Sequence, residues 1–373
     1  MTVNEQTDQL SEVVFLLKKL DGALLPEGLK EQIKLKLKRL RRTARQGQLS
    51  GEYESVSKYI DWCLAVPWGR FVPDVTDIVN AKKQMDTLFF GRDDVKEVIM
   101  EYLSIIARKA SMGKSDYVAP VLAFVGVQGA GKTTLAKAIA KVLGRPFFRI
   151  PLGAIGSSAE VRGMSPEVLS SQPGQIIRSL VKSGCCNPVI LLDEFDKVSG
   201  NEDLRKDFMS MMLEILDPQQ NYAFKDQYID YPVDLSKVLF IITANRFTTI
   251  SRELLDRLEI IEFMDYTPEE KTVIAKNFLF PKALDYAGLT VGELQIADDV
   301  WPLFTRTYGN SQGVRRYERN LQRLCRKTLK RIMLGEITSL VINSTNAESY
   351  VNDVMTDIET LRDIDYTELN KQS

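Results

Sequence analysis

The chain has 373 residues, of which 44% are hydrophobic and 27% charged, so it is long and apolar enough to form two or three folded domains. Its 49 basic and 50 acidic residues nearly cancel, which gives no overall charge signal for a nucleic acid or a membrane surface as partner. It contains no histidine, which excludes Ser-His-Asp hydrolysis, Cys-His proteolysis and almost every zinc enzyme.

The N-terminal region shows helical periodicity over residues 8–45, with a break between Gly22 and Pro26. The part after the break is strongly basic, a pattern that fits contact with nucleic acid or acidic lipid but more often marks a solvated helix face. A second amphipathic segment, residues 56–68, reaches a proline that we expect to stop its helix. No apolar run suits a signal peptide or the ~20 residues of a membrane span, so we expect no membrane contact. Residues 1–79 are assigned to a helical arm and linker.

From about residue 80, strand and helix signals alternate, which predicts βαβ units and a parallel sheet within an α/β domain at residues 80–265. The expected strands are residues 121–125, 147–150, 189–192, 238–243 and 259–263. The third and fourth strands are continuous aliphatic runs, typical of strands that are buried on both faces.

After residue 266 the strand signals nearly vanish, which predicts a small, mainly helical domain at residues 266–345. Thr267–Glu270 offers an N-cap, a proline at the first helical position and a capping-box glutamate, so a helix should begin there. The acidic tail, residues 346–373, carries four apolar residues on one helical face. These residues are Val351, Val354, Ile358 and Leu361. The tail fits a short docked helix and a linker without a partner equally well.

A glycine-rich segment lies between the first expected strand and a helix expected at residues 133–143. It fits the pattern G-x-x-x-x-G-K-[ST] with Gly126, Val127, Gln128, Gly129, Ala130, Gly131, Lys132 and Thr133, and Thr134 follows. In this motif backbone N–H groups surround phosphates, and the N-terminus of the next helix faces them. Lys132 would reach the β- and γ-phosphates, and the Thr133 hydroxyl would bind Mg²⁺. The segment therefore predicts ATP and Mg²⁺ as cofactors.

Polar residues follow two of the buried strands. Asp193 and Glu194 end the third strand, where Asp193 suits Mg²⁺ binding through water and Glu194 suits polarisation of the attacking water. This pair predicts a hydrolase. Asn245 ends the fourth strand and could orient the same water, although asparagine at a strand end is usually turn chemistry. Arg257 is a candidate to neutralise γ-phosphate charge from a neighbouring subunit, but taken alone it is better explained as a surface ion pair.

The order of these motifs resembles that of AAA+ ATPases, and several stretches narrow the resemblance to the ATPase module of Lon proteases. The matching stretches are Tyr59-Ile60-Asp61-Trp62, Val66-Pro67-Trp68, Leu191 to Lys197, Leu213 to Asn221, Asp234 to Val238, Leu255 to Ile261 and Gly313-Val314-Arg315. The resemblance covers residues 56–345. It implies a five-stranded parallel sheet of order 5-1-4-3-2, a helical lid, and homo-oligomeric rings of six with ATP sites between subunits. It also implies that Asn245 is a first sensor, Arg257 a trans-acting finger and Arg315 a second sensor.

The chain departs from the Lon pattern in two places. A Lon chain continues into a protease domain with a Ser-Lys dyad, and the segment after residue 345 is too short to fold around one, so we expect no peptidase activity of its own. The substrate-gripping pore loop of the family carries an aromatic and an aliphatic residue after an Arg-Gly pair. Here the residues at these positions after Arg162 and Gly163 are Val168 and Leu169. An aliphatic pair offers less contact area than a pair with an aromatic ring, so the sequence does not establish processive threading of a substrate.

Four cysteines in a chain of this length predict reduced thiols and a cytoplasmic protein. The vicinal Cys185 and Cys186 fit partly buried thiols better than a redox or metal element, since no histidine or second cysteine pair accompanies them. Taken together, the patterns predict an ATP-hydrolysing, ring-forming motor that remodels or threads protein. Either a separate peptidase acts with it in trans, or it is the ATPase piece of a longer protease. The alternatives are a nucleotide-gated switch that binds a partner through its tail and, with less support, a nucleic-acid remodeller.

Overall fold

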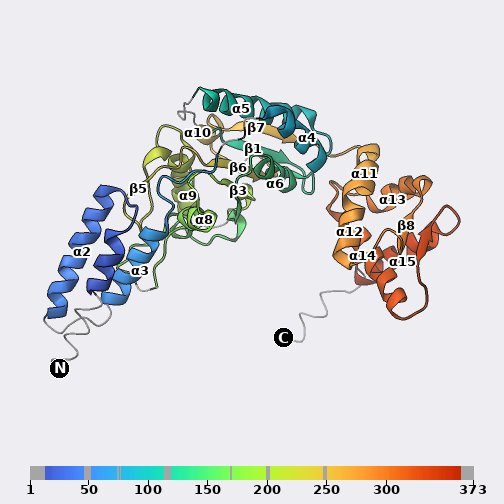
Figure 1. Ribbon diagram of the computed structural model, residues 1–373. Coiled ribbons are helices and arrows are strands. Elements are labelled where there is room, and N and C mark those ends of the chain that lie inside the picture. The colour runs from blue at the N-terminus through green and yellow to red at the C-terminus, as the bar shows by residue number, and fades with distance from the viewer. Residues whose placement is uncertain are drawn as a thin grey trace. The chain divides into compact units, whose positions relative to one another are not determined.

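The computed structural model describes residues 13–45, 52–73, 75, 77–112, 119–168, 170–198, 202–246 and 250–362. The chain forms two compact units. Unit 1 comprises Met1–Val125 and Thr133–Ile261, and unit 2 comprises Gly126–Lys132 and Glu262–Ser373 (Figure 1).

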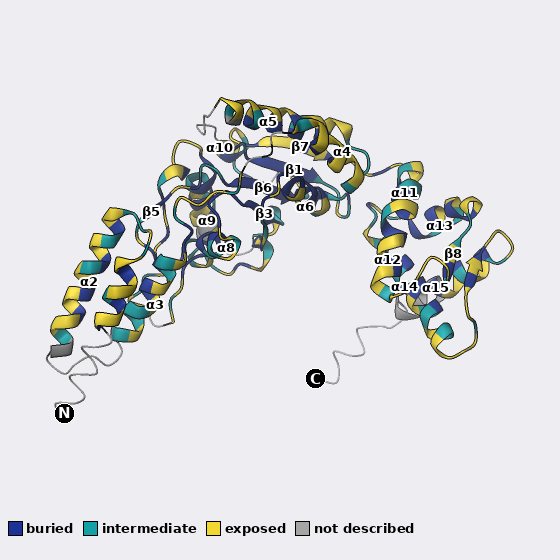
Figure 2. Cartoon of the chain, in the orientation of Figure 1, coloured by how far each residue is buried: buried dark blue, intermediate teal, exposed yellow. Residues whose placement is uncertain are grey.

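The main sheet has five strands in the order β2-β3-β6-β1-β7, which is the predicted order 5-1-4-3-2 read from the other end. The strands are β1 (Leu122–Gly126), β2 (Phe147–Pro151), β3 (Val189–Asp193), β6 (Leu239–Ala244) and β7 (Glu259–Phe263). β6 pairs in parallel with β1 and with β3, and β3 pairs in parallel with β2. Every residue of β3 and β6 is buried, as their aliphatic composition predicts (Figure 2). The α/β fold class is confirmed.

Helices and short turns precede and connect these strands. The helices are α4 (Ile78–Leu88), α5 (Asp93–Ser111), α6 (Lys132–Val142), α7 (Ala159–Arg162), α8 (Gln175–Ser183), α9 (Glu202–Leu216) and α10 (Arg252–Leu255). The 3₁₀ turns are Leu152–Ala154, Phe195–Lys197 and Asn221–Ala223. A small antiparallel hairpin, β4 (Phe224–Lys225) with β5 (Pro232–Val233), has strands of two residues each. Strands this short carry no periodic sequence signal, so the hairpin was not predicted.

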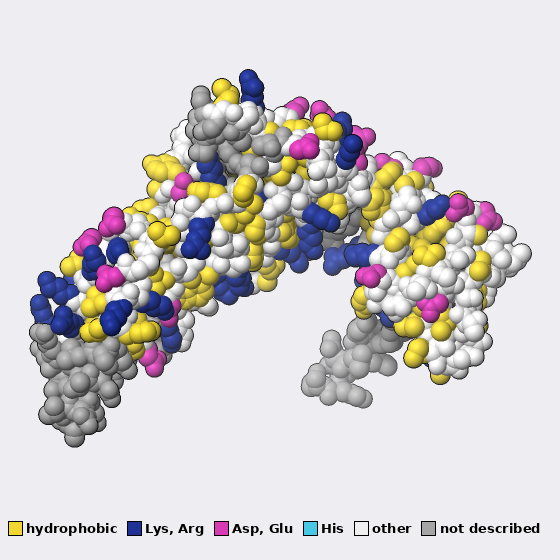
Figure 3. Space-filling model, viewed as in Figure 1, with side chains coloured by type: hydrophobic (Ala, Val, Ile, Leu, Met, Phe, Trp, Pro, Cys, Tyr) yellow, Lys and Arg dark blue, Asp and Glu magenta, His cyan; other side chains and the backbone are white. Residues whose placement is uncertain are grey.

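The N-terminal helices are present where the periodicity predicts them. Residues 13–21 are helical, and α2 (Glu27–Arg45) and α3 (Glu52–Ala65) follow. Their buried side chains, such as Leu37 and Tyr59, belong to the same hydrophobic cluster as residues of the main sheet. Lys and Arg side chains gather on the surface over α2 (Figure 3).

Unit 2 is mainly helical beyond the glycine-rich segment. Its helices are α11 (Pro268–Ile274), a π-helical turn (Ala275–Leu279), α12 (Phe280–Ala287), a 3₁₀ turn (Asp298–Val300), α13 (Trp301–Tyr308), α14 (Arg315–Met333) and α15 (Ala347–Arg362). The predicted capping box is confirmed, because the Thr267 hydroxyl accepts the Glu270 N–H and the Glu270 carboxylate accepts the Thr267 N–H. Two strands, β8 (Leu294–Ile296) and β9 (Leu340–Ile342), pair in parallel and were not predicted, since each has only three residues.

The tail forms a docked helix rather than a free linker up to Val354. Val351 and Val354 are buried, and Lys327 on α14 lies 2.8 Å from the Asp353 carboxylate. The side chains of Ile358 and Leu361 lie outside those that the structure describes. None of the helices in the described part of the chain is long and apolar enough to cross a membrane.

The four cysteines are buried free thiols, as predicted. The Cys186 thiol donates to the Pro67 carbonyl at 2.8 Å, and burial raises its pKa. Burial also raises the pKa of Cys63 and of Cys325, each to about 12, which keeps these groups protonated. Among the described residues, no cluster of three or more Cys, Asp or Glu residues could hold a metal ion.

The docking of α15 predicts a specific stability change. Val354→Ala should lower the free energy of unfolding of unit 2 by about 1.5 kcal/mol, because losing two buried methyl groups costs about 2 kcal/mol and alanine returns about 0.5 kcal/mol of helix propensity. Urea denaturation measures this change. Ser349→Ala, on the exposed face of the same helix, serves as the control. Equal stability of wild type and Val354→Ala would contradict the docking.

Candidate functional site

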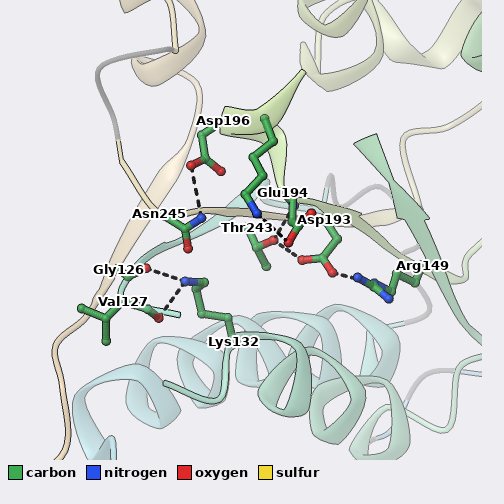
Figure 4. Close-up of polar contacts among 10 residues, drawn as sticks. Gly126, Val127, Lys132, Arg149, Asp193, Glu194, Asp196, Thr243 and Asn245 are labelled. Carbon is green, nitrogen blue, oxygen red and sulfur yellow. Dashed lines mark hydrogen bonds and ion pairs between the residues drawn. The ribbon is translucent and has the colours of Figure 1, made fainter. Parts of the chain in front are cut away.

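Polar side chains meet where β3 and β6 end, at the carboxyl edge of the main sheet (Figure 4). The Thr243 hydroxyl on β6 donates to the Asp193 carboxylate on β3. The same hydroxyl accepts the backbone N–H of Glu194 at 3.0 Å. Thr243 is 2% exposed, so the bond to Asp193 is buried, and the bond from Glu194 is partly buried. One buried hydroxyl thus fixes two consecutive acidic residues, a function that the sequence analysis did not assign to Thr243.

The backbone of Glu194 has left-handed dihedral angles, φ 59° and ψ 46°. A non-glycine residue in this region costs about 1 kcal/mol, so the surrounding bonds must maintain it. The bond from the Glu194 N–H to Thr243 is one of them. The Glu194 side chain is 38% exposed, and its carboxylate lies 3.2 Å from the Lys197 ammonium. The turn therefore directs this carboxylate out of the sheet into an accessible position.

Asp193 has a second partner that comes from the neighbouring strand. Arg149 on β2 donates from Nε to the Asp193 carboxylate at 2.5 Å. Asp193 is 5% exposed, so its charge is compensated in a buried position. The sequence analysis missed Arg149, because only the pairing of β2 with β3 brings it to the acid.

Asn245 lies one residue beyond the end of β6. Its side-chain Nδ2 donates to Asp196 at 3.2 Å, which orients the amide (Figure 4). The other oxygen of Asp196 is buried and has no hydrogen-bond partner among the described residues. Asp196 is a second residue that the sequence analysis missed. The structure thus brings Asp193, Glu194 and Asn245 to one sheet edge, as predicted for parallel strands.

The glycine-rich segment, residues 126–132, belongs to unit 2 and follows β1. Gly126, Gly129 and Gly131 have φ values of 148°, 78° and 89°, which other residues rarely adopt. A Cβ atom on Gly126 would lie 2.0 Å from the Phe263 carbonyl oxygen. The buried Lys132 ammonium donates to the carbonyl oxygens of Gly126, at 2.5 Å, and Val127, at 3.0 Å. The backbone of the segment therefore curves closely around the Lys132 ammonium at the start of α6.

Arg315 begins α14 directly beside this segment. The Val314 N–H donates to the Gly129 carbonyl at 3.0 Å, and a Cβ on Gly129 would lie 3.1 Å from the Arg315 Cβ. The Arg315 side chain is exposed and makes no hydrogen bond or ion pair with the described residues. Thr133 and Thr134 lie in the first turn of α6.

Arg257 contacts a different set of residues. Its Nε lies 3.3 Å from the Asp217 carboxylate, and its Nη1 donates to the Glu253 carbonyl at 2.5 Å. The Gln219 N–H, with a smaller contribution from Arg257, lowers the pKa of Asp217. Within one chain Arg257 therefore forms the ion pair that its sequence alone suggested.

The loop of residues 163–174 carries the exposed Val168, whereas Leu169 lies outside the described residues. Asp226 is fully buried and lies beside both ends of this loop, with a hydrogen bond to one of them. It accepts the Gly174 N–H at 2.8 Å, and a Cβ on Gly163 would lie 2.7 Å from its carboxylate. Its other backbone donors are Tyr228, at 2.8 Å, and Ile229, at 3.1 Å. Burial raises the pKa of Asp226 to about 6, although these N–H donors oppose the shift.

Two family models match parts of this chain. Residues 122–266 match the family "ATPase family associated with various cellular activities (AAA)", and residues 285–340 match the Lon protease AAA+ ATPase lid domain.

Individual relatives agree with these two matches. The chain is 40% identical to a Lon protease of Chloroflexus aurantiacus, over 90% of this chain and 40% of the relative. It is 40% identical to Lon protease 1 of Bacillus subtilis, over 94% of this chain and 44% of the relative. It is 42% identical to Lon protease 1 of Thermus thermophilus, over 87% of this chain and 40% of the relative. The chain spans about two-fifths of the length of these relatives.

The buried Asp226 predicts a pH dependence of stability. Its folded-state pKa, about 6, exceeds its ordinary value of 3.8, so the folded protein binds more protons between these values. The stabilisation is complete below about pH 4, and about 3 kcal/mol of it should be lost as pH rises to about 6. Asp226→Asn should remove this slope in urea denaturation followed from pH 4 to 7.5. Asp207→Asn, an exposed site on α9, should retain it. Parallel profiles for wild type and Asp226→Asn would refute the prediction.

Proposed function

Because this chain carries the AAA+ ATPase module of the Lon protease family, we propose that it binds ATP with Mg²⁺ and hydrolyses it to remodel protein substrates. The observation that carries the proposal is the glycine-rich segment. Its glycines have dihedral angles that other residues rarely adopt, and neighbouring backbone lies where a side chain would begin. A buried ammonium donates to its carbonyl oxygens. Both features suit a polyphosphate, which needs backbone N–H donors and a cation at close range.

Nucleotide binding would use residues of the segment and the helix that follows it. Backbone N–H groups of the segment would bind phosphate oxygens, and Lys132 would exchange the Gly126 and Val127 carbonyls for the β- and γ-phosphates. Arg315, which starts α14 beside Gly129, would contact the γ-phosphate. Thr133 and Asp193 supply the hydroxyl and carboxylate oxygens that Mg²⁺ prefers, Asp193 through water. Mg²⁺ would neutralise charge that develops on the phosphates.

Hydrolysis would use the carboxyl edge of the sheet. Glu194 would polarise the attacking water, since its carboxylate is accessible and its backbone is fixed by Thr243. Asn245, oriented by Asp196, would position the same water. Lys197 now pairs with Glu194 and would have to release it for this step. β1 lies beside β6 in the sheet and runs parallel to it, so the two strands end at the same edge.

The finer features are part of the same proposal. We keep the four-part division at residues 1–79, 80–265, 266–345 and 346–373, and a cytoplasmic location. A ring of six copies would place Arg257 on the γ-phosphate of a neighbour. Exposed Val168 would touch an unfolded substrate in such a ring. A separate peptidase stays an optional partner, and the lack of a peptidase site in this chain stays a prediction. Docking of α15 through Val354 weighs against a partner-binding tail that begins at residue 346.

Two substitutions separate binding from turnover. Lys132→Ala should weaken ATP binding at least about 100-fold, since it removes a charged phosphate ligand. Glu194→Gln should keep ATP affinity within about threefold and lower kcat by about 10²–10⁴-fold, because it affects only the transition state. Equilibrium binding of a fluorescent ATP analogue and phosphate release measure the two effects. Lys141→Ala, an exposed site on α6, is the control. Normal turnover in Glu194→Gln would refute its assignment.

A trans-acting Arg257 predicts a dependence on assembly. Specific ATPase activity should rise with protein concentration, and Arg257→Ala should lower it by at least about tenfold and flatten the dependence. Mixing Arg257→Ala with Glu194→Gln should restore part of the turnover, because one interface then pairs an intact Glu194 with an intact Arg257. Arg252→Ala, exposed in the same region, is the matched control. Concentration-independent wild-type activity would argue against a function across subunits.

A further inference from the structure

Asp265, between β7 and α11, connects three segments of unit 2. One carboxylate oxygen accepts the Gly313 N–H at 2.8 Å and the Tyr266 N–H at 2.8 Å. The other oxygen lies 3.2 Å from the ammonium of Lys271 on α11. The sequence analysis gave neither Asp265 nor Lys271 a function.

Lys271 binds the same turn from its other side. Its side chain is only 8% exposed, and its ammonium donates to the carbonyl oxygens of Ser311, at 2.8 Å, and Gly309, at 3.3 Å. A buried ammonium is stable only with such partners. Asp265 and Lys271 therefore hold the main chain of residues 309–313 without using any of its side chains.

The turn held in this way lies against the glycine-rich segment. Gly313 has a φ of 67°, and a Cβ there would lie 2.2 Å from the Gln128 carbonyl oxygen. The next N–H, of Val314, donates to the Gly129 carbonyl at 3.0 Å. Tyr266, which follows Asp265, donates its hydroxyl to the Ala130 carbonyl at 2.9 Å. The contacts between turn and segment are thus mostly backbone contacts, and a displaced turn would lose them.

We propose that Asp265 and Lys271 are positioning residues that place Arg315 at the γ-phosphate of ATP. Arg315 follows this turn directly as the first residue of α14, so the place of the turn sets the origin of its side chain. Displacing the backbone that carries such a side chain by about 1 Å can lower the rate of a reaction up to about 100-fold. The inference rests on the proposed function, since it assumes that the segment binds ATP and that Arg315 contacts the γ-phosphate.

The test compares binding of ATP, as a non-hydrolysable analogue, with binding of ADP, which lacks the phosphate that Arg315 would contact. Asp265→Ala should weaken binding of the analogue about tenfold and that of ADP less than about threefold. Lys271→Met should do the same. Asp265→Asn keeps an oxygen for the Gly313 N–H and should recover most of the affinity. Asp298→Ala, which breaks the exposed ion pair with Lys276 in the same unit, is the control.

A double-mutant cycle with Arg315→Ala decides whether Asp265 acts through that side chain. In the Arg315→Ala background, Asp265→Ala should weaken analogue binding by less than about threefold. An undiminished tenfold loss there, or equal losses for the analogue and ADP, would overturn the inference and leave the proposed function standing. If Arg315→Ala itself weakens both nucleotides equally, the function assigned to Arg315 fails and the inference fails with it. If wild type binds neither nucleotide, the proposed ATPase function fails.

Discussion

The register between β3 and β6 is the constraint on which the carboxyl-edge site depends. Leu192 pairs with Ile242, so the next residues, Asp193 and Thr243, meet on the same face and form a hydrogen bond. A shift of one residue would turn every side chain of a strand to the other face and break this bond. The buried aliphatic side chains of both strands make such a shift unfavourable. The position of Glu194 therefore follows from hydrophobic packing several residues upstream.

Two carboxylates, the buried Asp226 and the partly exposed Asp265, hold the loops that the proposed function needs. Asp226 accepts the Gly174 N–H at one end of residues 163–174, and Asp265 accepts the Gly313 N–H beside α14. Both carboxylates bind main-chain groups, and Val168 and Arg315 are exposed. The two sites differ in how charge is compensated. Asp265 has an ammonium within 3.2 Å, whereas Asp226 relies mainly on backbone donors, and burial raises its pKa.

The features that could be predicted from the sequence are those with a local residue pattern. The five strands, the glycine-rich segment and the capping box each have a period or a fixed spacing of residue types, and the structure contains all three. The strand order came from the resemblance, because pairing across long separations has no local signal. Arg149, Asp226 and Asp265 were missed for the same reason. In the sequence each is a charged residue among many, and only the fold gives it a buried partner. The short strands β8 and β9 have too few residues to show a period.

The sequence offered a surface ion pair of Arg257 as an alternative to a function in trans, but the pair that the structure shows, with Asp217, is compatible with such a function. A guanidinium has five N–H donors, and the structure uses Nε for Asp217 and Nη1 for the Glu253 carbonyl. Asp217 keeps its charge, since the Gln219 N–H lowers its pKa. An arginine held at two points has already lost much of its rotamer freedom, whereas a free one would lose up to about 2 kcal/mol on engaging a phosphate. An ion pair within the chain would therefore prepare Arg257 for a neighbouring site, with its remaining donors available.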